Sequence, residues 1–381
     1  MKESRNNVLK EWKEVKLGEV LELKNGERPK INDYGIIPVY GANGIMGKTN
    51  DFLVDNDFTI IVGRVGASGE IHLAKGKVWI SDNAIYSQSY KSKKIHLPFL
   101  FYLLTFKNLK QFATKTTHPI ITQSFLKNLP IPLPPLPEQQ KIAEILSTVD
   151  SAIEKVNQAI EKTQRLKKGL MQELLTKGIG YNEFKDTEIG RIPKEWEVVR
   201  LKESEEIKLI MGQSPPGKSY NKEGKGLPFI QGKAEFGNMY PSAILWTTQP
   251  TKIAEEGDVL ISVRAPVGDV NICPYRLCIG RGLAAVRIKK GSNIFYFYWF
   301  QKEKQHIENI GKGSTFKAVT KDELSNLFIP FPPLPEQQKI AEILSTVDKR
   351  LELLKKKKEK LERIKKGLMN DLLTGKRRVK V

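Results

Sequence analysis

Residues 131–150 read IPLPPLPEQQKIAEILSTVD and residues 329–348 read IPFPPLPEQQKIAEILSTVD, so that the two stretches differ at a single position. The same offset of 198 residues continues along the chain, where KKGLM at residues 167–171 recurs at residues 365–369. Such a period is too long for a solenoid repeat and indicates two copies of a larger unit. The chain is therefore a tandem duplication of a variable block followed by a near-constant block.

Each near-constant block predicts a long helix that begins at a proline. Pro137 and Pro335 suit the first helical turn, where the missing N–H of proline costs nothing. Apolar residues then recur in alternating steps of four and three, a seam typical of a coiled coil. The seam residues are Ile142, Leu146, Val149, Ile153, Val156 and Ile160 in the first copy, and Ile340, Leu344, Val347, Leu351, Leu354 and Leu361 in the second.

Two further features of these helices leave alternatives open. Apolar residues at Leu166 and Ile364 predict a four-residue slip of the seam in the later part of each helix. An amphipathic helix buried in a globular core would give a similar pattern, but two equally long copies in one chain favour pairing with each other.

The variable blocks contain short β-like runs separated by glycine-bearing turns, for example at residues 58–62 and 259–263. An apolar helical stretch follows in each block, at residues 97–104 and 294–301. Each variable block therefore predicts a compact α+β domain. The predicted division of the chain is a first domain at residues 1–133, a central helix at 134–178, a second domain at 179–331, and a C-terminal helix with a basic tail at 332–381.

The charge balance favours a polyanionic partner. The 381 residues include 63 Lys and Arg against 43 Asp and Glu, giving a formal net charge of +20, so nucleic acid is the first candidate. Residues 355–358 and 376–380 are strongly basic, although a solvated helix face would explain the first run equally well. No apolar run approaches the ~20 residues of a membrane span, and no signal sequence is evident, so a cytoplasmic protein without a membrane segment is expected. With two cysteines and four scattered histidines, neither a disulfide scaffold nor a metal site is expected.

The motifs of common enzymes are missing. Residues 42–49 (ANGIMGKT) fit a relaxed phosphate-loop pattern, but turns and strands follow them instead of the helix that a phosphate loop must open. No Gly-x-Gly-x-x-Gly follows a strand, and no Pro-Pro pair has the surroundings that amino-group methyltransferases use. We therefore predict no catalytic residue in this chain.

Polar and basic loop residues are the candidate DNA contacts. Arg64 and Arg264 each follow a core strand at matching places, and arginine is the commonest bidentate partner of guanine. A buried ion pair or a contact within a turn is the alternative role for each. The loops at residues 114–118 and 311–317 lie at equivalent places before the helix starts, which suggests a shared role in phosphate or base contact. The remaining candidates are Lys48, Thr116, Thr117, His118, Gln123, Gln213, Ser214, Lys218, Gln231, Lys233, Gly313, Ser314, Thr315 and Lys317.

Several of these motifs together resemble a known family, the specificity subunit of type I restriction–modification systems. They are the two PLPEQQKIA helix starts with their KKGLM ends, Trp12 and Trp196 near the domain starts, and the segments PVYGANG and SDNAI at residues 38–44 and 81–85. The resemblance covers essentially the whole chain. It implies an α+β fold in which two tandem target-recognition domains are each followed by a long helix, and the two helices pair as an antiparallel coiled coil.

The resemblance also implies partners. Double-stranded DNA would be the ligand, with each domain reading one half of a bipartite target and the helix length setting the gap between the halves. Two modification subunits would bind S-adenosylmethionine and methylate adenine, and restriction subunits would use ATP and Mg²⁺; this chain itself would bind no cofactor or metal. Because the two variable blocks differ, the target should be asymmetric. The resemblance leaves self-association open when partners are absent.

Two other classes of function remain as alternatives. A scaffold whose coiled coil only organises protein partners would show no sequence preference for DNA in its variable blocks. An enzyme with an undetected site would cleave or methylate DNA as the purified chain alone.

Overall fold

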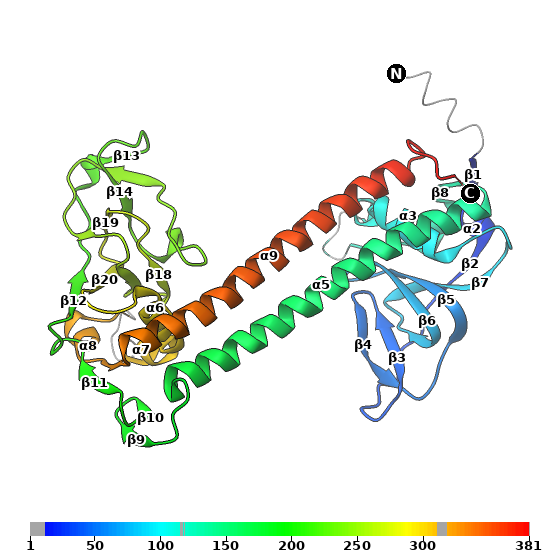
Figure 1. The fold of residues 1–381 in the computed structure, drawn as a ribbon. Helices are drawn as coiled ribbons and strands as arrows, with labels where there is room; N and C mark the ends of the chain where they lie inside the picture. Colours follow the sequence, from blue (N-terminus) through cyan, green and yellow to red (C-terminus); the bar gives the residue numbers. More distant parts are fainter. Residues whose placement is uncertain (1–11, 115–116, 118, 311–317, 381) are drawn as a thin grey trace. The chain divides into compact units, whose positions relative to one another are not determined.

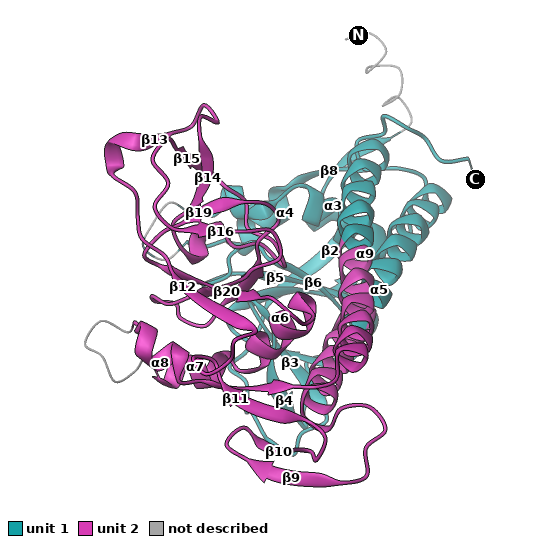
Figure 2. Ribbon diagram, turned by 60° about the vertical axis from the view of Figure 1, so that its left-hand side comes forward, with its two compact units in different colours: residues 1–158, 356–381 teal, residues 159–355 magenta. Residues whose placement is uncertain are grey.

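The computed structural model describes residues 12–114, 117, 119–310 and 318–380 (Figure 1). The chain forms two compact units, which Figure 2 colours separately. Unit 1 contains residues 1–158 and 356–381, and unit 2 contains residues 159–355. Each unit therefore combines one α+β domain with a segment of both long helices, α5 (Leu136–Lys177) and α9 (Leu334–Leu372).

The domain of unit 1 is built on a six-stranded sheet in the order β2-β7-β5-β6-β3-β4, in which only β3 and β6 run parallel among the described pairs. A separate antiparallel pair, β1 with β8, leads into the long helix α5. The strands are β1 (Lys13–Lys16), β2 (Leu21–Asn25), β3 (Ile37–Gly41), β4 (Gly44–Thr49), β5 (Val54–Gly63), β6 (Ile71–Ile80), β7 (Ala84–Tyr90) and β8 (Pro130–Leu133). The helices are α2 (Leu17–Val20), α3 (Leu97–Phe106) and α4 (Gln123–Asn128).

The domain of unit 2 repeats this plan. A four-stranded sheet in the order β12-β20-β17-β18 corresponds to β2-β7-β5-β6, and β11 with β21 corresponds to β1 with β8. A five-stranded sheet in the order β13-β15-β14-β19-β16 and the hairpin β9–β10 complete it. The strands are β9 (Phe184–Thr187), β10 (Gly190–Pro193), β11 (Glu197–Arg200), β12 (Ile207–Met211), β13 (Tyr220–Asn221), β14 (Leu227–Ile230), β15 (Leu245–Thr247), β16 (Ile253–Ala254), β17 (Val259–Ser262), β18 (Val270–Ile272), β19 (Leu277–Ile279), β20 (Leu283–Ile288) and β21 (Phe328–Phe331). The helices are α6 (Asn293–Lys302), α7 (Lys304–Ile310) and α8 (Lys321–Ser325).

In each domain an apolar helix occupies the core. The α3 helix buries most of its residues, and α6 buries all six residues from Phe295 to Phe300, as expected for helices that are hydrophobic on every side. Residues of both long helices join these cores. In unit 1 these residues include Ile142 and Leu146 from α5 and Leu372 from α9, and in unit 2 they include Leu344 from α9 and Leu175 from α5.

The two long helices run antiparallel within each unit. In unit 1 Lys365 lies 2.6 Å from Asp150, and Arg378, beyond the end of α9, reaches Glu138 at the start of α5. This antiparallel pairing confirms the predicted fold class. Among the seam residues, the buried ones are Ile142, Leu146, Val156, Ile340, Leu344, Val347 and Leu351, and the partly buried ones are Val149, Ile153, Ile160, Leu354 and Leu361.

The predicted slip of the seam is wrong. Leu166 is 51% exposed and Ile364 is 42% exposed, whereas Thr163 is buried in the unbroken four–three register. The same register brings Lys167 and Lys365 into the seam. The prediction was wrong because it considered hydrophobic residues only. These two seam positions hold lysines whose charges are paired.

A tyrosine–aspartate–lysine cluster joins each domain to both helices. In unit 1 the Tyr102 hydroxyl of α3 donates to Asp150 of α5 (2.8 Å), and the ammonium of Lys365 from α9 lies 2.6 Å from Asp150 and over the Tyr102 ring. In unit 2 the corresponding residues are Tyr298, Asp348 and Lys167, with 2.8 Å from hydroxyl to carboxylate and 2.7 Å from ammonium to carboxylate. Burial, together with the hydrogen bond to Asp150, raises the pKa of Tyr102, so its hydroxyl remains a donor.

The duplicated Glu-Gln pair fastens the start of each long helix. Glu138 is buried and accepts hydrogen bonds from Trp12 Nε1 (3.3 Å) and from two nitrogens of Arg378 (2.8 Å each). The next residue, Gln139, accepts from the backbone N–H of His96 (2.9 Å) at the start of α3. The bond between Trp12 and Glu138 explains why the motif occurs together with a tryptophan that lies far before it in the sequence.

In unit 2 the same motif has different partners. Glu336 accepts from Trp196 Nε1 (3.0 Å), from the Tyr181 hydroxyl (2.8 Å) and from the backbone N–H of Ile179 (2.9 Å). Gln337 accepts from the backbone N–H of Ser292 at 2.9 Å, as Gln139 does from His96. The repeated residues therefore perform repeated structural roles.

Candidate nucleic-acid interface

Four loops of unit 1 meet in one cluster, which we call loop cluster 1: residues 26–28, 41–44, 63–69 and 81–83. Backbone hydrogen bonds connect each of these loops to a neighbour or to the adjoining strand end. The bonds run from Gly26 N to Ala84 O (2.9 Å), from Glu27 N to Ile80 O (2.9 Å), from Ser81 N to Tyr40 O (2.8 Å) and from Arg64 N to Asn83 O (2.8 Å).

Unit 2 holds an equivalent set, loop cluster 2: residues 212–214, 231–235, 262–268 and 280–282. The same four hydrogen bonds recur. They run from Gly212 N to Leu283 O (2.9 Å), from Gln213 N to Ile279 O (3.0 Å), from Gly280 N to Ile230 O (2.8 Å) and from Val263 N to Gly282 O (2.9 Å). The loop backbones of the two domains therefore follow one scaffold.

Glycine is required at the first contact of this scaffold in both units. A Cβ atom on Gly26 would lie 2.1 Å from the carbonyl oxygen of Ser81, and one on Gly212 would lie 2.1 Å from that of Gly280. No side chain fits at such a distance from backbone, so these glycines let two loops approach each other closely.

The side chains on this common scaffold differ between the units. The exposed or half-buried polar residues are Glu27, Arg28, Asn43, Arg64, Asp82 and Asn83 in loop cluster 1, and Gln213, Ser214, Gln231, Lys233, Glu235, Arg264 and Arg281 in loop cluster 2. Loop cluster 1 has two carboxylates and two arginines, whereas loop cluster 2 has three basic residues and one carboxylate, Glu235, which accepts from Gly232 N (3.2 Å). The two surfaces therefore offer different hydrogen-bonding patterns on one backbone frame.

The prediction that Arg64 and Arg264 occupy matching places is wrong by one residue. The N–H groups of Arg64 and Val263 make the equivalent bond to the loop opposite, so Arg264 corresponds to Val65. Neighbouring residues of an extended segment point to opposite sides. The sequence shows the glycine-bounded loop but not its register, which only the hydrogen bonds reveal.

The structure places some candidates of the first domain in loop cluster 1. Arg64 is half-buried and its Nη1 donates to the Asp82 carbonyl (3.4 Å). Thr117 is exposed, and the segment after it is bonded to the Arg64 carbonyl through Ile121 N (3.0 Å). Gln123 lies elsewhere, since its amide donates to a backbone carbonyl of β2. Thr116 and His118 lie outside the described residues.

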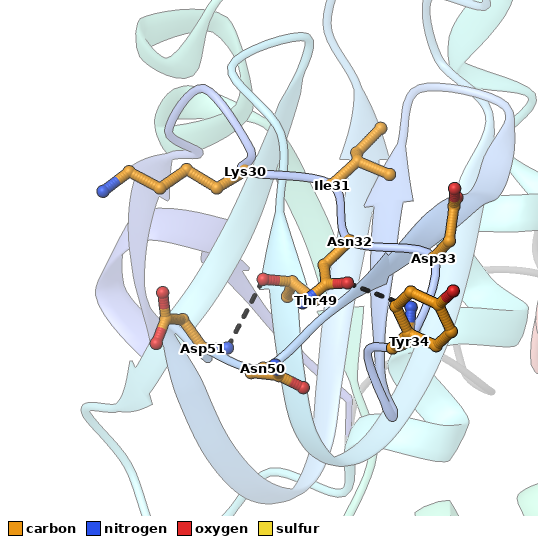
Figure 3. A pocket seen from close by; sticks show the side chains of 8 residues that line it. All are labelled: Lys30, Ile31, Asn32, Asp33, Tyr34, Thr49, Asn50 and Asp51. Carbon is orange, nitrogen blue, oxygen red and sulfur yellow. Dashed lines mark hydrogen bonds between the residues drawn. The ribbon is translucent and has the colours of Figure 1, made fainter.

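Lys48 lies on the edge strand β4, four residues beyond the turn that belongs to loop cluster 1, and is exposed. Its carbonyl accepts from the backbone N–H of Asn32 (2.8 Å). The segment beside it lines a surface cavity of about 510 Å³ between residues 30–34 and 49–51, where the Asn32 side chain accepts from Tyr34 N (Figure 3). The charged residues that line this cavity are Asp33, Asp51 and Lys30, so it is acidic on balance, which does not suit phosphate (Figure 3).

Several candidates of the second domain lie in loop cluster 2. Gln213, Gln231 and Arg264 are exposed there, and the Ser214 hydroxyl accepts from the backbone N–H of Arg281 (3.3 Å). Lys218 is exposed on a short 3-10 helix that follows this cluster in the sequence. Gly313, Ser314, Thr315 and Lys317 lie outside the described residues.

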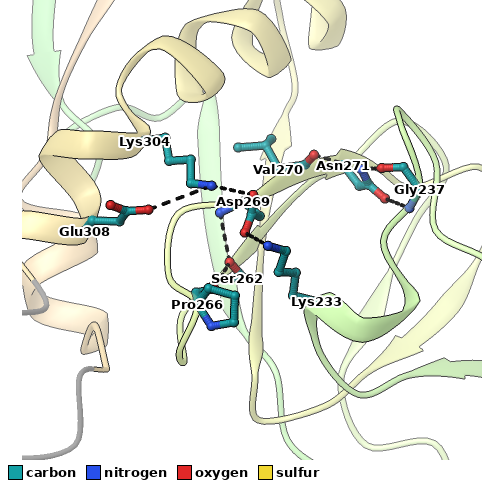
Figure 4. Close-up of polar contacts among 9 residues, drawn as sticks. All are labelled: Lys233, Gly237, Ser262, Pro266, Asp269, Val270, Asn271, Lys304 and Glu308. Carbon is teal, nitrogen blue, oxygen red and sulfur yellow. Dashed lines mark hydrogen bonds and ion pairs between the residues drawn. The ribbon is translucent and has the colours of Figure 1, made fainter. Parts of the chain in front are cut away.

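Lys233 has a partner within its own domain. Its ammonium lies 2.7 Å from Asp269, which also binds Lys304 at 2.7 Å (Figure 4). Partial burial alone would raise the pKa of Asp269, but the two lysines outweigh it and hold that pKa below its usual value. Lys233 therefore braces its loop against the helix α7, and its charge is largely neutralised.

Sequence reasoning missed six exposed residues of these clusters: Glu27, Arg28, Asn43, Asp82, Asn83 and Arg281. Each lies one or two residues from a glycine or in the tight turn before a buried strand. The sequence signal that was available is the pair of glycines, Gly26 and Gly212, each at the end of a β-like run.

Among the described residues, no group of three or more histidine, cysteine or acidic side chains could hold a metal ion. Both cysteines are buried and free, and burial raises the pKa of Cys273 to about 12, so it is a thiol rather than a ligand or nucleophile. No helix in the described part of the chain has the length and apolar content needed to cross a bilayer.

The geometry defines a duplicated protein with two loop surfaces, each carried by a domain anchored to a pair of antiparallel helices. Comparison with known proteins identifies its family. The family model for the type I restriction modification DNA specificity domain matches residues 9–163 and again residues 193–363. The chain belongs to the family of type I restriction–modification specificity subunits, which bind DNA and have no catalytic activity of their own.

Relatives and a solved structure agree. The chain is 51% identical over 295 residues, 75% of this chain and 69% of the relative, to the putative type I restriction enzyme MjaX specificity subunit of Methanocaldococcus jannaschii. It is 31% identical to the MjaVIII specificity subunit of the same organism, over 98% of this chain and 94% of the relative. The type I restriction–modification S subunit from M. genitalium shares the fold, with a TM-score of 0.68 at 19% identity over 95% of this chain and 96% of that one.

Proposed function

We propose that this chain reads a bipartite, gapped and asymmetric DNA target, with one loop cluster for each half. The observation that carries this proposal is the common loop scaffold of the two units, on which the exposed side chains differ in charge and hydrogen-bonding pattern. Direct readout of bases depends on such side chains, while a shared backbone presents them in the same way to a groove. Different side chains therefore imply different half-sites.

The paired helices would set the spacing between the half-sites. Each domain is fixed to both helices by its tyrosine–aspartate–lysine cluster, and to the start of one helix by the Glu-Gln motif. A domain held at several points cannot slide along its helix segments, so helices of fixed length would give the gap between the half-sites a fixed size. The excess of Lys and Arg would add the phosphate contacts that make binding depend on salt.

Two modification subunits would dock on the helix starts. The exposed residues Gln140, Lys141, Glu144 and Thr148 lie along one face of α5, and α9 carries the same residues at the equivalent exposed positions. Just beyond them the exposed residues differ between the helices, as at Ser151 and Lys349. A partner that binds twice in the same way explains why an exposed face is repeated although it contributes nothing evident to the core.

The methyl donor S-adenosylmethionine would then belong to the modification subunits, and ATP with Mg²⁺ to restriction subunits. This chain would supply neither cofactor site. Its contribution to the reaction is to select the DNA and to hold each modification subunit near one half-site.

The proposed target reading is tested by mapping methylated adenines across the genome by long-read sequencing, with and without this gene. A gapped, asymmetric motif whose methylation disappears with the gene is the expected result. An unchanged map in cells that demonstrably express the modification subunit would contradict the proposal and favour a scaffold role.

The docking face has its own test. The pair Lys141→Glu and Lys339→Glu should abolish co-purification of the modification subunit. The control pair Lys155→Glu and Lys349→Glu changes exposed helix residues that are not repeated and should leave co-purification intact. Equal retention by both double variants would place the docking surface elsewhere.

A further inference from the structure

One loop of each cluster forms a tight turn with an exposed tip: Asp82 and Asn83 are exposed in unit 1, and in unit 2 Arg281 is exposed at the position of Asp82. The residues on either side of the tip make the same bonds in both units. Ser81 N and Gly280 N donate to the carbonyl at the end of the neighbouring parallel strand (2.8 Å each), and the turn closes through Ala84 N to Ser81 O and Leu283 N to Gly280 O (3.0 Å each). The two tips are therefore structurally equivalent positions with opposite charge.

The loop that follows β5 in unit 1, and the loop that follows β17 in unit 2, lie across from this tip; in unit 2 Val263 N donates to Gly282 O (2.9 Å). In unit 1 the N–H of Arg64 bonds to the carbonyl of Asn83, and Arg64 Nη1 reaches the Asp82 carbonyl (3.4 Å). In unit 2 the hydroxyl of Ser214 accepts from Arg281 N (3.3 Å). Both tips are thus held in place by two other loops of their cluster, as a side chain needs to be if it is to choose a base rather than slide along phosphates.

The opposite charges suit different bases. In the major groove a guanidinium donates two hydrogen bonds to the O6 and N7 atoms of guanine, whereas a carboxylate accepts from the N4 amino group of cytosine. A carboxylate facing DNA is also repelled by the phosphates, so it contributes discrimination at the expense of general affinity. An arginine contributes both discrimination between bases and general affinity for DNA.

We propose that the tip residue of this turn selects one base in each half-site, with Arg281 reading a guanine and Asp82 reading a cytosine. This inference rests on the proposed function and adds the residue and the base class to it. It also predicts that removing the side chain has opposite effects on DNA affinity at the two equivalent positions. Removing Arg281 weakens binding to every DNA sequence, whereas removing Asp82 strengthens binding to sequences that lack the target.

The test uses the full chain, co-purified with the modification subunit of its own system, to select bound duplexes from a random pool. Wild-type protein should return a two-part motif. Arg281→Asp should replace guanine by cytosine at one position of one half-site, and Asp82→Arg should make the reverse change in the other half-site. Each variant should bind the wild-type target roughly 5- to 150-fold more weakly.

Affinity for a random-sequence duplex provides the second readout. Arg281→Ala should lower this affinity and Asp82→Ala should raise it. Arg281→Lys keeps the charge but loses the two-pronged donor, so it should keep the random-duplex affinity while relaxing the guanine. Arg276→Asp and Asp33→Arg make the same charge changes at exposed positions outside the loop clusters and should leave both half-sites unchanged.

The outcomes separate this inference from the proposed function. A wild-type selection without any two-part motif would contradict the proposed function and the inference with it. A two-part motif that stays the same in Arg281→Asp and Asp82→Arg would overturn the inference alone. If Arg281→Asp fails to fold, as judged by circular dichroism, the test relies on Arg281→Lys, which keeps the charge. An unaltered guanine preference in that variant overturns the assignment.

Discussion

The two units solve one structural problem with the same glutamate, buried in unit 1 and half-buried in unit 2, but with different partners. In unit 1 the partner of Glu138 is charged, since Arg378 from the C-terminal tail binds it with two nitrogens. In unit 2 the partners of Glu336 are neutral, and two of them, Tyr181 and the N–H of Ile179, come from the segment that follows α5. The comparison teaches that duplication preserved the acceptor and the geometry, while the donors could change.

The loop clusters show the same separation on the surface. The backbone bonds that fix the loops recur within about 0.1 Å in the two units, whereas the exposed residues Glu27 and Gln213 differ in charge, and Asp82 and Arg281 differ in both charge and shape. A frame set by main-chain hydrogen bonds tolerates any exposed side chain, because none of its bonds involves that side chain. Such a frame can change what it recognises without changing its fold.

The largest expected difference between the units concerns the two glutamates. Glu138→Ala removes a buried carboxylate from its ion pair with Arg378 and should lower the free energy of unfolding of unit 1 by about 2–4 kcal/mol, less than for a fully buried pair because Arg378 is 32% exposed. Glu336→Ala removes an acceptor of neutral donors only and should cost unit 2 about 1–3 kcal/mol. Hydrogen exchange of the core helices α3 and α6 measures the two units separately.

Glu144→Ala changes an exposed residue of the same helix and serves as the control for both glutamate variants. It should leave hydrogen exchange of α3 and α6 within about 0.5 kcal/mol of wild type. Equal losses for Glu138→Ala and Glu336→Ala would mean that the charged partner in unit 1 adds nothing over the neutral ones in unit 2.

Removing the tyrosine hydroxyl from either tyrosine–aspartate–lysine cluster should destabilise its own unit by the same amount. Tyr102→Phe and Tyr298→Phe each remove a 2.8 Å hydrogen bond to a carboxylate and should each cost about 1.5–3 kcal/mol in their own unit. The two losses should agree within about 0.5 kcal/mol because the clusters have the same geometry. Tyr34→Phe, which alters a tyrosine that is 92% exposed, is the control, and a loss in one unit only would show that the clusters are not equivalent.

A smaller difference should appear on acidification. Burial lowers the pKa of His96 at the start of α3, and the equivalent residue of unit 2 is Ser292, which cannot titrate. Because the folded-state pKa lies below the unfolded value of 6.5, the unfolded chain takes up the proton first. The stability of unit 1 should therefore be intact above pH 6.5 and decrease as the pH falls below it.

His96→Ser tests this directly by importing the unit 2 residue. Ser292 caps α6 by accepting from Phe295 N (3.3 Å), whereas the His96 side chain makes no such bond. The variant should lose the acid sensitivity of unit 1 and gain about 0.5–1 kcal/mol at neutral pH from the new cap. Urea unfolding at pH 5 and pH 7.5 measures both effects, and an unchanged pH dependence would mean that another group is responsible.

The sequence alone predicted the features that repetition and periodicity reveal. The 198-residue duplication, the long helices and the α+β domains all follow from residues such as Pro137 and Ile142, whose spacing depends only on local geometry. It could not predict loop register, and Arg64 was matched with Arg264 instead of Val263. It also could not show that Asp82 meets Arg64, 18 positions earlier, or that Arg281 meets Ser214, 67 positions earlier, because such meetings depend on strand pairing that no local pattern specifies.

The helix seam gives the smallest expected effect and the sharpest test of its register. Leu166→Gln and Ile364→Gln should each change stability by less than about 0.5 kcal/mol, since both side chains are largely exposed and the seam continues through Thr163 and the paired lysines. If the seam instead slipped onto these residues, each change would bury an amide in an apolar contact and cost about 2–5 kcal/mol. Leu372→Gln is the positive control, because Leu372 is 3% exposed and belongs to the core of unit 1. Thermal unfolding of the three variants distinguishes the two registers, because only the slipped one makes all three equally harmful.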